Sequence, residues 1–192
     1  MRVFLDFEAS SLAKDSYPIE VGWVFEDGTD EAHLIRPIPA WRDWDRRAEA
    51  LHHISRAALV RDGEPAEAVA NRMLATLAEH ELYASAPSWD GKWLSTLLRG
   101  AGLPRHALRL RKTDEAQIEA ATEALRPVLP EPALPGAVER VLTRAYDAVG
   151  RGKIVHRALD DARRERELWL AVRRIAGEEA AATAAGAKVE GS

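Results

Sequence analysis

Three stretches near the start of the chain have the pattern of β-strands. Residues 2–8 alternate between the two faces of a strand, and residues 18–25 place large apolar side chains at every second position. The pair Asp27-Gly28 separates the second stretch from residues 31–36, which is a hairpin signal. The chain is therefore predicted to open with three short strands.

Helical spacing becomes frequent farther along the chain. Residues 64–80 contain Pro65 near the start and repeat apolar residues three or four positions apart, and residues 81–86 return to a strand pattern. Ser88 is the predicted cap of the next helix, which two glycines end. The remaining predicted elements are a strand at 107–111, helices at 114–125 and 137–149 around a proline-rich connector at 126–136, and a last helix from about 156 to 177.

The order of these elements indicates the fold class. Strands first, and then strands that alternate with helices, are typical of one α/β domain with a mixed sheet. The 192 residues are 46% hydrophobic, which is enough for one well-buried core. We expect this domain to cover residues 1–177. Residues 178–192 contain no aromatic residue, leucine or isoleucine and are predicted to form a disordered tail.

Composition and charge narrow the function. No stretch approaches the ~20 apolar residues of a membrane span, and the first residues lack the features of a secretory signal, so a cytoplasmic protein is predicted. Because the chain has no cysteine, carboxylates, histidine or water would hold any metal, which favours Mg²⁺ or Mn²⁺. A net charge of −4 argues against a protein that coats nucleic acid through phosphate contacts, but not against an enzyme that binds a few nucleotides through metal ions.

Two acidic sites, one on a strand and one just after a strand, are candidates for chemistry. Asp6 and Glu8 are two apart on the first strand, so they share a face, where a buried pair would repel and need a cation. A solvated strand face explains the same pattern. Asp90 follows a strand, a position where α/β sheets tend to build sites, although an acidic residue in a first helical turn also complements the helix dipole.

A third candidate lies at the start of the last helix. His156 precedes the helix and Asp161 lies one turn inside it, so both side chains can face one cleft. Asp160 points about 100° away, so only one of the two aspartates should face a given site. A capping histidine and an ordinary acidic first turn are the alternative interpretation.

Taken in order, these residues resemble a known family. Asp6-x-Glu8 on the first strand, Asp90 after a middle strand and His156-x-x-x-x-Asp161 at the last helix resemble the DEDDh superfamily of 3′–5′ exonucleases, which includes DnaQ-like and ribonuclease T-like enzymes. The resemblance extends over about residues 2–175. "YPIEVGWV", which contains Glu20, resembles the second strand of the family, and "HRALDDA" resembles its closing motif.

The resemblance implies a ribonuclease H-like fold, with a central mixed β-sheet flanked by helices. It also implies an enzyme that uses two Mg²⁺ or Mn²⁺ ions ~4 Å apart to hydrolyse phosphodiester bonds. Its substrates would be the 3′ ends of single-stranded or short DNA or RNA, and its products 5′-nucleotides. The metal ligands would be Asp6, Glu8, Asp90 and Asp161, and His156 would be the general base.

The resemblance also implies a substrate site after the first strand. Backbone amides from Ala9 to Leu12, including those of Ser10 and Ser11, would hold the terminal 3′-hydroxyl, Leu12 would wedge against a base, and His52 would line the nucleotide site. Ala9-Ser10-Ser11 stands where proofreading members have Thr-Thr-Gly or a similar trio.

Two other functions fit the same sequence. One is a nucleic-acid-binding protein that keeps the fold without catalysis, and the other is a metal-dependent nucleotide phosphohydrolase. The intact acidic set argues against the first, because a binding protein gains nothing from four repelling carboxylates. The absence of a Lys/Arg-rich phosphate loop argues against the second. The choice between RNA and DNA, and the oligomeric state, a homodimer included, stay open.

Overall fold

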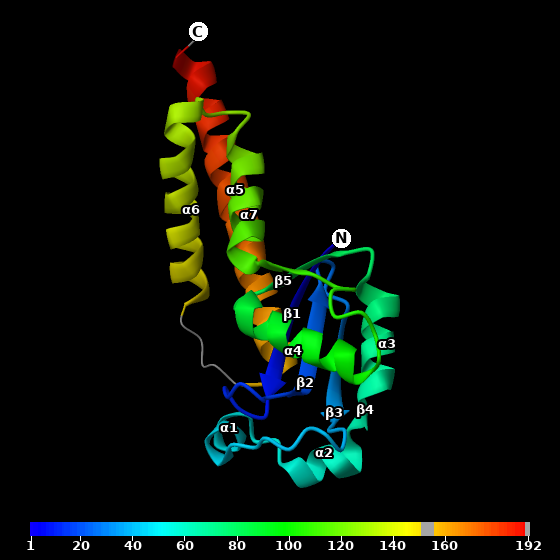
Figure 1. Cartoon of the computed structure of the whole chain (residues 1–192). Coiled ribbons are helices and arrows are strands. Elements are labelled where there is room, and N and C mark those ends of the chain that lie inside the picture. The colour runs from blue at the N-terminus through cyan, green and yellow to red at the C-terminus, as the bar shows by residue number, and fades with distance from the viewer. Residues whose placement is uncertain (151–155, 191–192) are drawn as a thin grey trace. The chain divides into compact units, whose positions relative to one another are not determined.

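The computed structural model describes residues 1–150 and 156–190, and it divides the chain into two compact units (Figure 1). The first unit contains the sheet and the start of the last helix. The second unit is helical. Their bounds are Met1–Lys112 with Ile154–Arg164 for the first, and Thr113–Lys153 with Glu165–Ser192 for the second.

The first unit is built on a six-stranded sheet in the order β4-β3-β2-β1-β5-β6. β1 pairs antiparallel with β2 and parallel with β5, so the sheet is mixed, as the sequence predicted. The predicted hairpin between β2 and β3 is also present, with Gly28 at φ 98° in its turn. The strands are β1 Arg2–Ala9, β2 Pro18–Phe25, β3 Asp30–Arg36, β4 Glu64–Pro65, β5 Glu81–Ala84 and β6 Leu110–Lys112.

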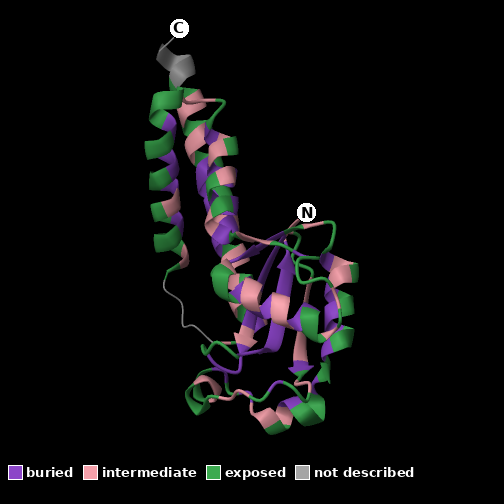
Figure 2. Ribbon diagram, in the orientation of Figure 1, coloured by how far each residue is buried: buried purple, intermediate pink, exposed green. Residues whose placement is uncertain are grey.

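Helices pack against this sheet, and its central strands β1, β2 and β5 are largely buried (Figure 2). Val3, Leu5 and Phe7 of β1 belong to the hydrophobic core together with residues of α3 and α4, such as Met73 and Leu97. Burying this apolar face is the main favourable contribution to folding of the unit. Its helices are α1 Arg46–His52, α2 Arg56–Asp62, α3 Ala66–Leu77, α4 Pro87–Gly100 and the first residues of α7 Ala158–Glu190.

Several boundaries differ from the predicted ones. α4 begins at Pro87 with Ala86 as its N-cap, so the prediction of Ser88 as the cap is wrong, because proline is itself well suited to the first helical position. The strand predicted at 107–111 is Leu110–Lys112. α1 and α2 were not predicted, because they are too short to show a helical period. Local caps start them: the Asp45 side chain accepts from Arg47 N, and Ser55 Oγ accepts from Ala58 N.

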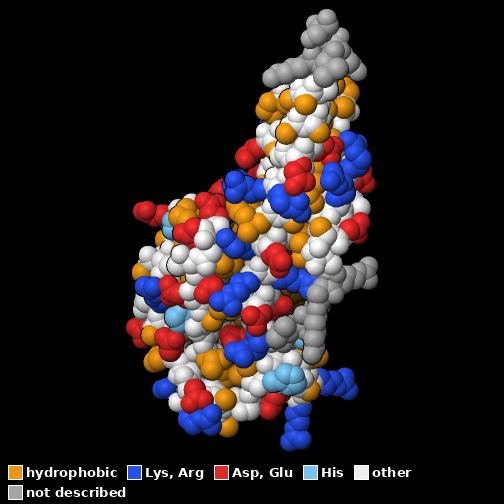
Figure 3. Space-filling view, turned by 180° about the vertical axis from the view of Figure 1, so that it is seen from behind, with side chains coloured by type: hydrophobic (Ala, Val, Ile, Leu, Met, Phe, Trp, Pro, Cys, Tyr) orange, Lys and Arg blue, Asp and Glu red, His pale blue; other side chains and the backbone are white. Residues whose placement is uncertain are grey.

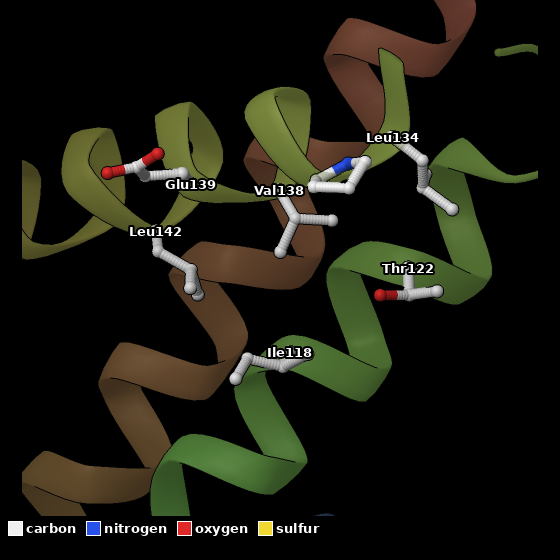
Figure 4. Close-up of a pocket in the computed structure, with 7 residues that line it drawn as sticks. Ile118, Thr122, Leu134, Val138, Glu139 and Leu142 are labelled. Atoms are coloured by element: carbon white, nitrogen blue, oxygen red, sulfur yellow. The ribbon is translucent and has the colours of Figure 1, made fainter. Parts of the chain in front are cut away.

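The second unit consists of α5, α6 and the continuation of α7. The predicted helices around the connector are confirmed as α5 Thr113–Leu125 and α6 Leu134–Val149, with a short 3₁₀ helix, η1 Glu131–Ala133, between them. A groove of about 390 Å³ lies between α5 and α6, where Ile118, Val138 and Leu142 turn toward one another (Figure 4). The groove is therefore mainly apolar.

The last helix is longer than predicted. α7 continues to Glu190, through residues for which the sequence predicted a disordered tail, and residues 191–192 lie outside the described part. Two properties of the segment explain the helix. It is rich in alanine, the strongest helix former, and Glu179 accepts hydrogen bonds from Arg140 and Arg144 of α6. No described helix combines the length and apolar character that a membrane-spanning segment needs.

Candidate metal centre

The acidic residues of β1 share one face of the sheet with two residues of β2. Asp6 lies opposite Gly22 in the antiparallel pair, and Glu8 lies opposite Glu20. Side chains of directly opposite residues project on the same side of a sheet. The register shifts just after Glu8, so β1 becomes irregular at the end of this acidic pair, which is a common feature next to active sites.

Gly22 allows the start of α7 to lie directly on this face. A Cβ atom at Gly22 would be 2.3 Å from the backbone N of Leu159 and 2.5 Å from its Cα, so any side chain there would clash with the first turn of α7. The helix therefore approaches the strand more closely than it could over any other residue type. This close approach carries His156 and Asp161 toward the β1 carboxylates.

Among the described residues, one group could hold a metal ion. Glu8, His156 and Asp161 each offer one ligand atom, and these three atoms lie within 4.8 Å of one another. All three side chains are half-buried. His156 itself has a left-handed backbone, with φ 53°, which is uncommon for a residue other than glycine. The structure thus brings together three of the five predicted metal and catalytic residues, from two elements far apart in the sequence.

Asp6 and Asp90 are not part of this group of three. Asp6 is half-buried on the same face of β1. Asp90 is 2% exposed in the first turn of α4, and its Oδ2 accepts a hydrogen bond from the Ala86 N–H at 3.3 Å. Asp160, next to Asp161, points elsewhere: its side chain is 49% exposed and lies 3.7 Å from Arg163. Of the two neighbouring aspartates, Asp161 is therefore the one that lies beside Glu8 and His156.

The charges of the group favour a bound cation. Burial, and after it repulsion from the carboxylates of Asp161, Glu20 and Asp90, raises the pKa of Glu8 from 4.5 to about 7, although Arg157 acts in the opposite direction. Burial also raises the pKa of Asp161, while the nearby His156 lowers it. A divalent cation would remove this repulsion, and the two carboxylates offer the oxygen ligands that Mn²⁺ and Mg²⁺ prefer. The residues present therefore fit such an ion.

Glu20 and Arg157 form an ion pair beside the group. The Glu20 side chain is 3% exposed, and the Arg157 guanidinium donates to both of its carboxylate oxygens. Glu20 was predicted only as part of a strand that resembles the family, and its pairing with Arg157 was not predicted. Its signal was available, because Glu20 is the one acidic residue of β2, a strand whose other residues are neutral.

The predicted substrate segment follows β1. Ser10 and Ser11 are buried, and their hydroxyls both donate to the Asp43 carboxylate, at 2.9 and 2.5 Å. These hydroxyls therefore hold the loop in place. Ala9 is 7% exposed, whereas Leu12 is 71% exposed. Of this segment, Leu12 is the side chain that can reach a ligand.

His52 is buried at the end of α1. Its Nδ1 accepts a hydrogen bond from the Ile54 N–H at 3.0 Å, so the proton of a neutral imidazole resides on Nε2. Burial lowers the pKa of His52, which favours this neutral form. Within the described part of the chain, Nε2 has no hydrogen-bond partner. His52 can therefore act as a donor, but not as a cation near neutral pH.

Trp89 is an exposed aromatic residue next to Asp90. Its side chain is 38% exposed, its ring lies 5.7 Å from that of Trp93, and the Lys92 Nζ lies 5.1 Å from its centroid. Elsewhere, the described Lys/Arg and Asp/Glu side chains on the face seen in Figure 3 are intermixed and form no continuous basic area. An exposed ring with a nearby ammonium is suited to stacking on a nucleobase.

The sheet order, the helices on its two faces and the acidic centre at the end of β1 define an α/β protein with a ribonuclease H-like fold. Neither a protein-family model nor a curated protein sequence matches the chain significantly. Among solved structures, the chain is similar to exonuclease I. The zinc-bound complex of E. coli exonuclease I with single-stranded DNA has a TM-score of 0.63 at 16% identity, over 90% of this chain and 40% of that one.

Two further structures of the same enzyme agree. A structure of exonuclease I matches 91% of this chain and 42% of that one, with a TM-score of 0.63 and 17% identity. The E. coli enzyme in complex with a dA16 oligonucleotide matches 93% of this chain and 42% of that one, with a TM-score of 0.61 and 15% identity. The chain thus spans about two fifths of the length of these proteins. At this identity, the similarity establishes the fold.

Proposed function

We propose that this protein is a metal-dependent 3′–5′ exonuclease of the DEDDh type, acting on single-stranded or short nucleic acid. The observation that carries the proposal is the convergence of Glu8, His156 and Asp161, whose ligand atoms lie within 4.8 Å of one another. The fold shared with exonuclease I, which has been solved with single-stranded DNA, supports the choice of substrate. The two-ion requirement and the 3′–5′ direction belong to the proposal.

The proposed metal ligands are Asp6, Glu8, Asp90 and Asp161, for Mg²⁺ or Mn²⁺. When bound, two such ions would neutralise the phosphate and lower the pKa of the attacking water. Glu8 and Asp161 lie in the group of three and would hold the ions most directly. Asp6 and Asp90 lie outside that group and would complete the set. This arrangement explains how a protein of net charge −4 can bind a polyanion.

His156 is proposed as the general base. A neutral imidazole has a free ring nitrogen that can take a proton from water. The water oxygen then bonds to phosphorus while the bond from phosphorus to the 3′ oxygen breaks, and that oxygen takes a proton from solvent. The products are a 5′-nucleotide and a strand one nucleotide shorter.

The substrate end is proposed to lie against Ala9, Ser10, Ser11, Leu12 and His52. Because the serine hydroxyls are engaged with Asp43, these serines would contribute through the backbone. Leu12, which is exposed, would pack against the terminal base. His52 would donate from Nε2 to an oxygen of the nucleotide.

The test is degradation of 5′-labelled DNA and RNA oligonucleotides, single-stranded and duplex, with Mn²⁺ or Mg²⁺. We expect a ladder of products that shorten by one nucleotide at a time and that EDTA abolishes. Asp161→Asn should remove the activity, whereas the matched control Asp160→Asn, at the exposed neighbouring carboxylate, should retain it. Activity that survives EDTA or Asp161→Asn would contradict the mechanism. Cleavage of mononucleotides alone would indicate a phosphohydrolase instead.

A further inference from the structure

Glu20 is a buried carboxylate that the proposed chemistry does not use. It lies opposite Glu8 in the β1–β2 pair, with its side chain 3% exposed. A second buried negative charge beside the acidic centre is costly unless it has partners. Its location therefore requires a reason other than metal binding.

Among the described residues, the hydrogen bonds of the Glu20 carboxylate come from the two residues that follow His156. Arg157 Nε lies 3.1 Å from both oxygens, and Arg157 Nη2 lies 2.5 Å from Oε1. The backbone N–H of Ala158 donates to Oε2 at 3.0 Å. Both oxygens are thus engaged by the chain between His156 and the first turn of α7. Glu20 is placed to hold this turn.

The turn needs such support. His156 is left-handed at φ 53°, a conformation that costs free energy for a residue with a side chain and persists only where its surroundings impose it. Ala158 is the first residue of α7, where N–H groups have no partner within the helix. Glu20 satisfies one of these groups and anchors Arg157, so it fixes the residues on the C-terminal side of His156.

We propose that Glu20 is a positioning residue, which acts through Arg157 and Ala158 to hold the His156 imidazole and the Asp161 carboxylate against Glu8. This inference rests on the proposed nuclease function and extends it to the residue that builds the site. Glu20 binds no ion and touches no substrate in this role. Its effect is on the geometry of the centre.

The test compares Glu20→Gln, Arg157→Met and the double variant in the full-length protein. The probe is a 5′-labelled single-stranded oligonucleotide with Mn²⁺. We expect each single variant to lower kcat about 10- to 100-fold, the usual effect of a residue that orients metal ligands, with KM changed less than about twofold. Because the two residues act as one unit, the double variant should be no more than about threefold slower than the slower single variant.

The double variant also covers the case in which a single variant fails to fold. It removes both charges, so it leaves no unpaired buried ion. The matched control is Glu31→Gln with Arg72→Met, an ion pair with a bidentate geometry of 2.9 and 2.6 Å remote from the centre. These control variants should keep the wild-type kcat. A merely structural role of Glu20 would lower stability and leave both kcat and Mn²⁺ affinity of the folded protein unchanged.

Two outcomes would overturn the inference while the wild type remains an active nuclease. One is an unchanged kcat in folded Glu20→Gln. The other is a higher KM for Arg157→Met whose effect multiplies with that of Glu20→Gln in the double variant. This result would mean that Arg157 binds phosphate independently of Glu20. If the wild type shows no nuclease activity, the proposed function fails. In that case Mn²⁺ affinity, measured by electron paramagnetic resonance, tests the positioning role of Glu20. A tenfold or greater loss of affinity in Glu20→Gln supports this role, and an unchanged affinity contradicts it.

Discussion

Replacing Glu8 by glutamine should stabilise the protein while it removes a proposed metal ligand. In the metal-free protein, burial together with repulsion from the Asp161 carboxylate raises the pKa of Glu8 from 4.5 to about 7. The folded state therefore disfavours the charged carboxylate. Glutamine has nearly the same shape and no charge, so Glu8→Gln removes this penalty at the expense of metal binding.

The size of the effect follows from the pKa. A rise from 4.5 to about 7 corresponds to roughly 3 kcal/mol against the ionised form, at about 1.4 kcal/mol per pH unit. Because Glu8 is only half-buried, solvent screening reduces this value, and we expect about 1–2 kcal/mol.

The sign follows from proton binding. Between pH 4.5 and about 7 the native state binds more protons at Glu8 than the unfolded state does, so this contribution to stability is present at low pH and is lost as the pH rises.

The assay is urea unfolding of the wild type and Glu8→Gln in EDTA between pH 5 and 8. The two proteins should have similar free energies of unfolding at pH 5, and Glu8→Gln should be more stable by about 1–2 kcal/mol at pH 8. Excess Mn²⁺ should stabilise the wild type and not the variant. Glu31→Gln is a control with the opposite expectation. A hydrogen bond from Arg72 lowers the pKa of Glu31, so the loss of its charge should lower the free energy of unfolding at pH 8. A variant that is no more stable than the wild type at pH 8 would refute the reasoning.

Two further substitutions test the surroundings of the centre. Gly22→Ala places a Cβ 2.3 Å from Leu159 N, so we expect overpacking to lower stability by about 1–3 kcal/mol and nuclease activity at least tenfold. Urea unfolding measures the stability and the ladder assay measures the activity. A fully active, stable variant would contradict the close approach of α7. Trp89→Ala should raise KM for single strands about 5- to 150-fold, as the loss of one stacking contact of about 1–3 kcal/mol predicts, with kcat little changed. An unchanged KM would exclude stacking there.

Much of the fold could be predicted from local patterns. The alternation in residues 2–8 and the Asp27-Gly28 turn specify β1 and the β2–β3 hairpin, because strand period and turn chemistry are local properties. The helices α1 and α2 were missed because short helices depend on caps more than on periodicity. The extension of α7 was missed because an alanine-rich segment without large hydrophobic residues has the composition of a disordered tail as well as that of a helix.

The candidate site, like the fold, could be predicted from the sequence only in part. The types of the reactive residues, and the fact that Asp6 and Glu8 share a face, follow from the sequence and the period of a strand. The helical angle between Asp160 and Asp161 predicted that only one of them would face the site, and the family resemblance indicated Asp161, which lies beside Glu8 in the structure. These properties depend on residues that are neighbours along the chain.

Only the tertiary structure decided which of the five residues converge and what holds them. Glu8 meets His156 and Asp161 because Gly22 lets α7 lie directly on β2, and Glu20 fixes the turn that carries His156. Both contacts join residues more than 130 positions apart in the sequence. A sequence pattern records spacing along the chain, whereas these contacts depend on the packing of a helix against a sheet, which no local period contains.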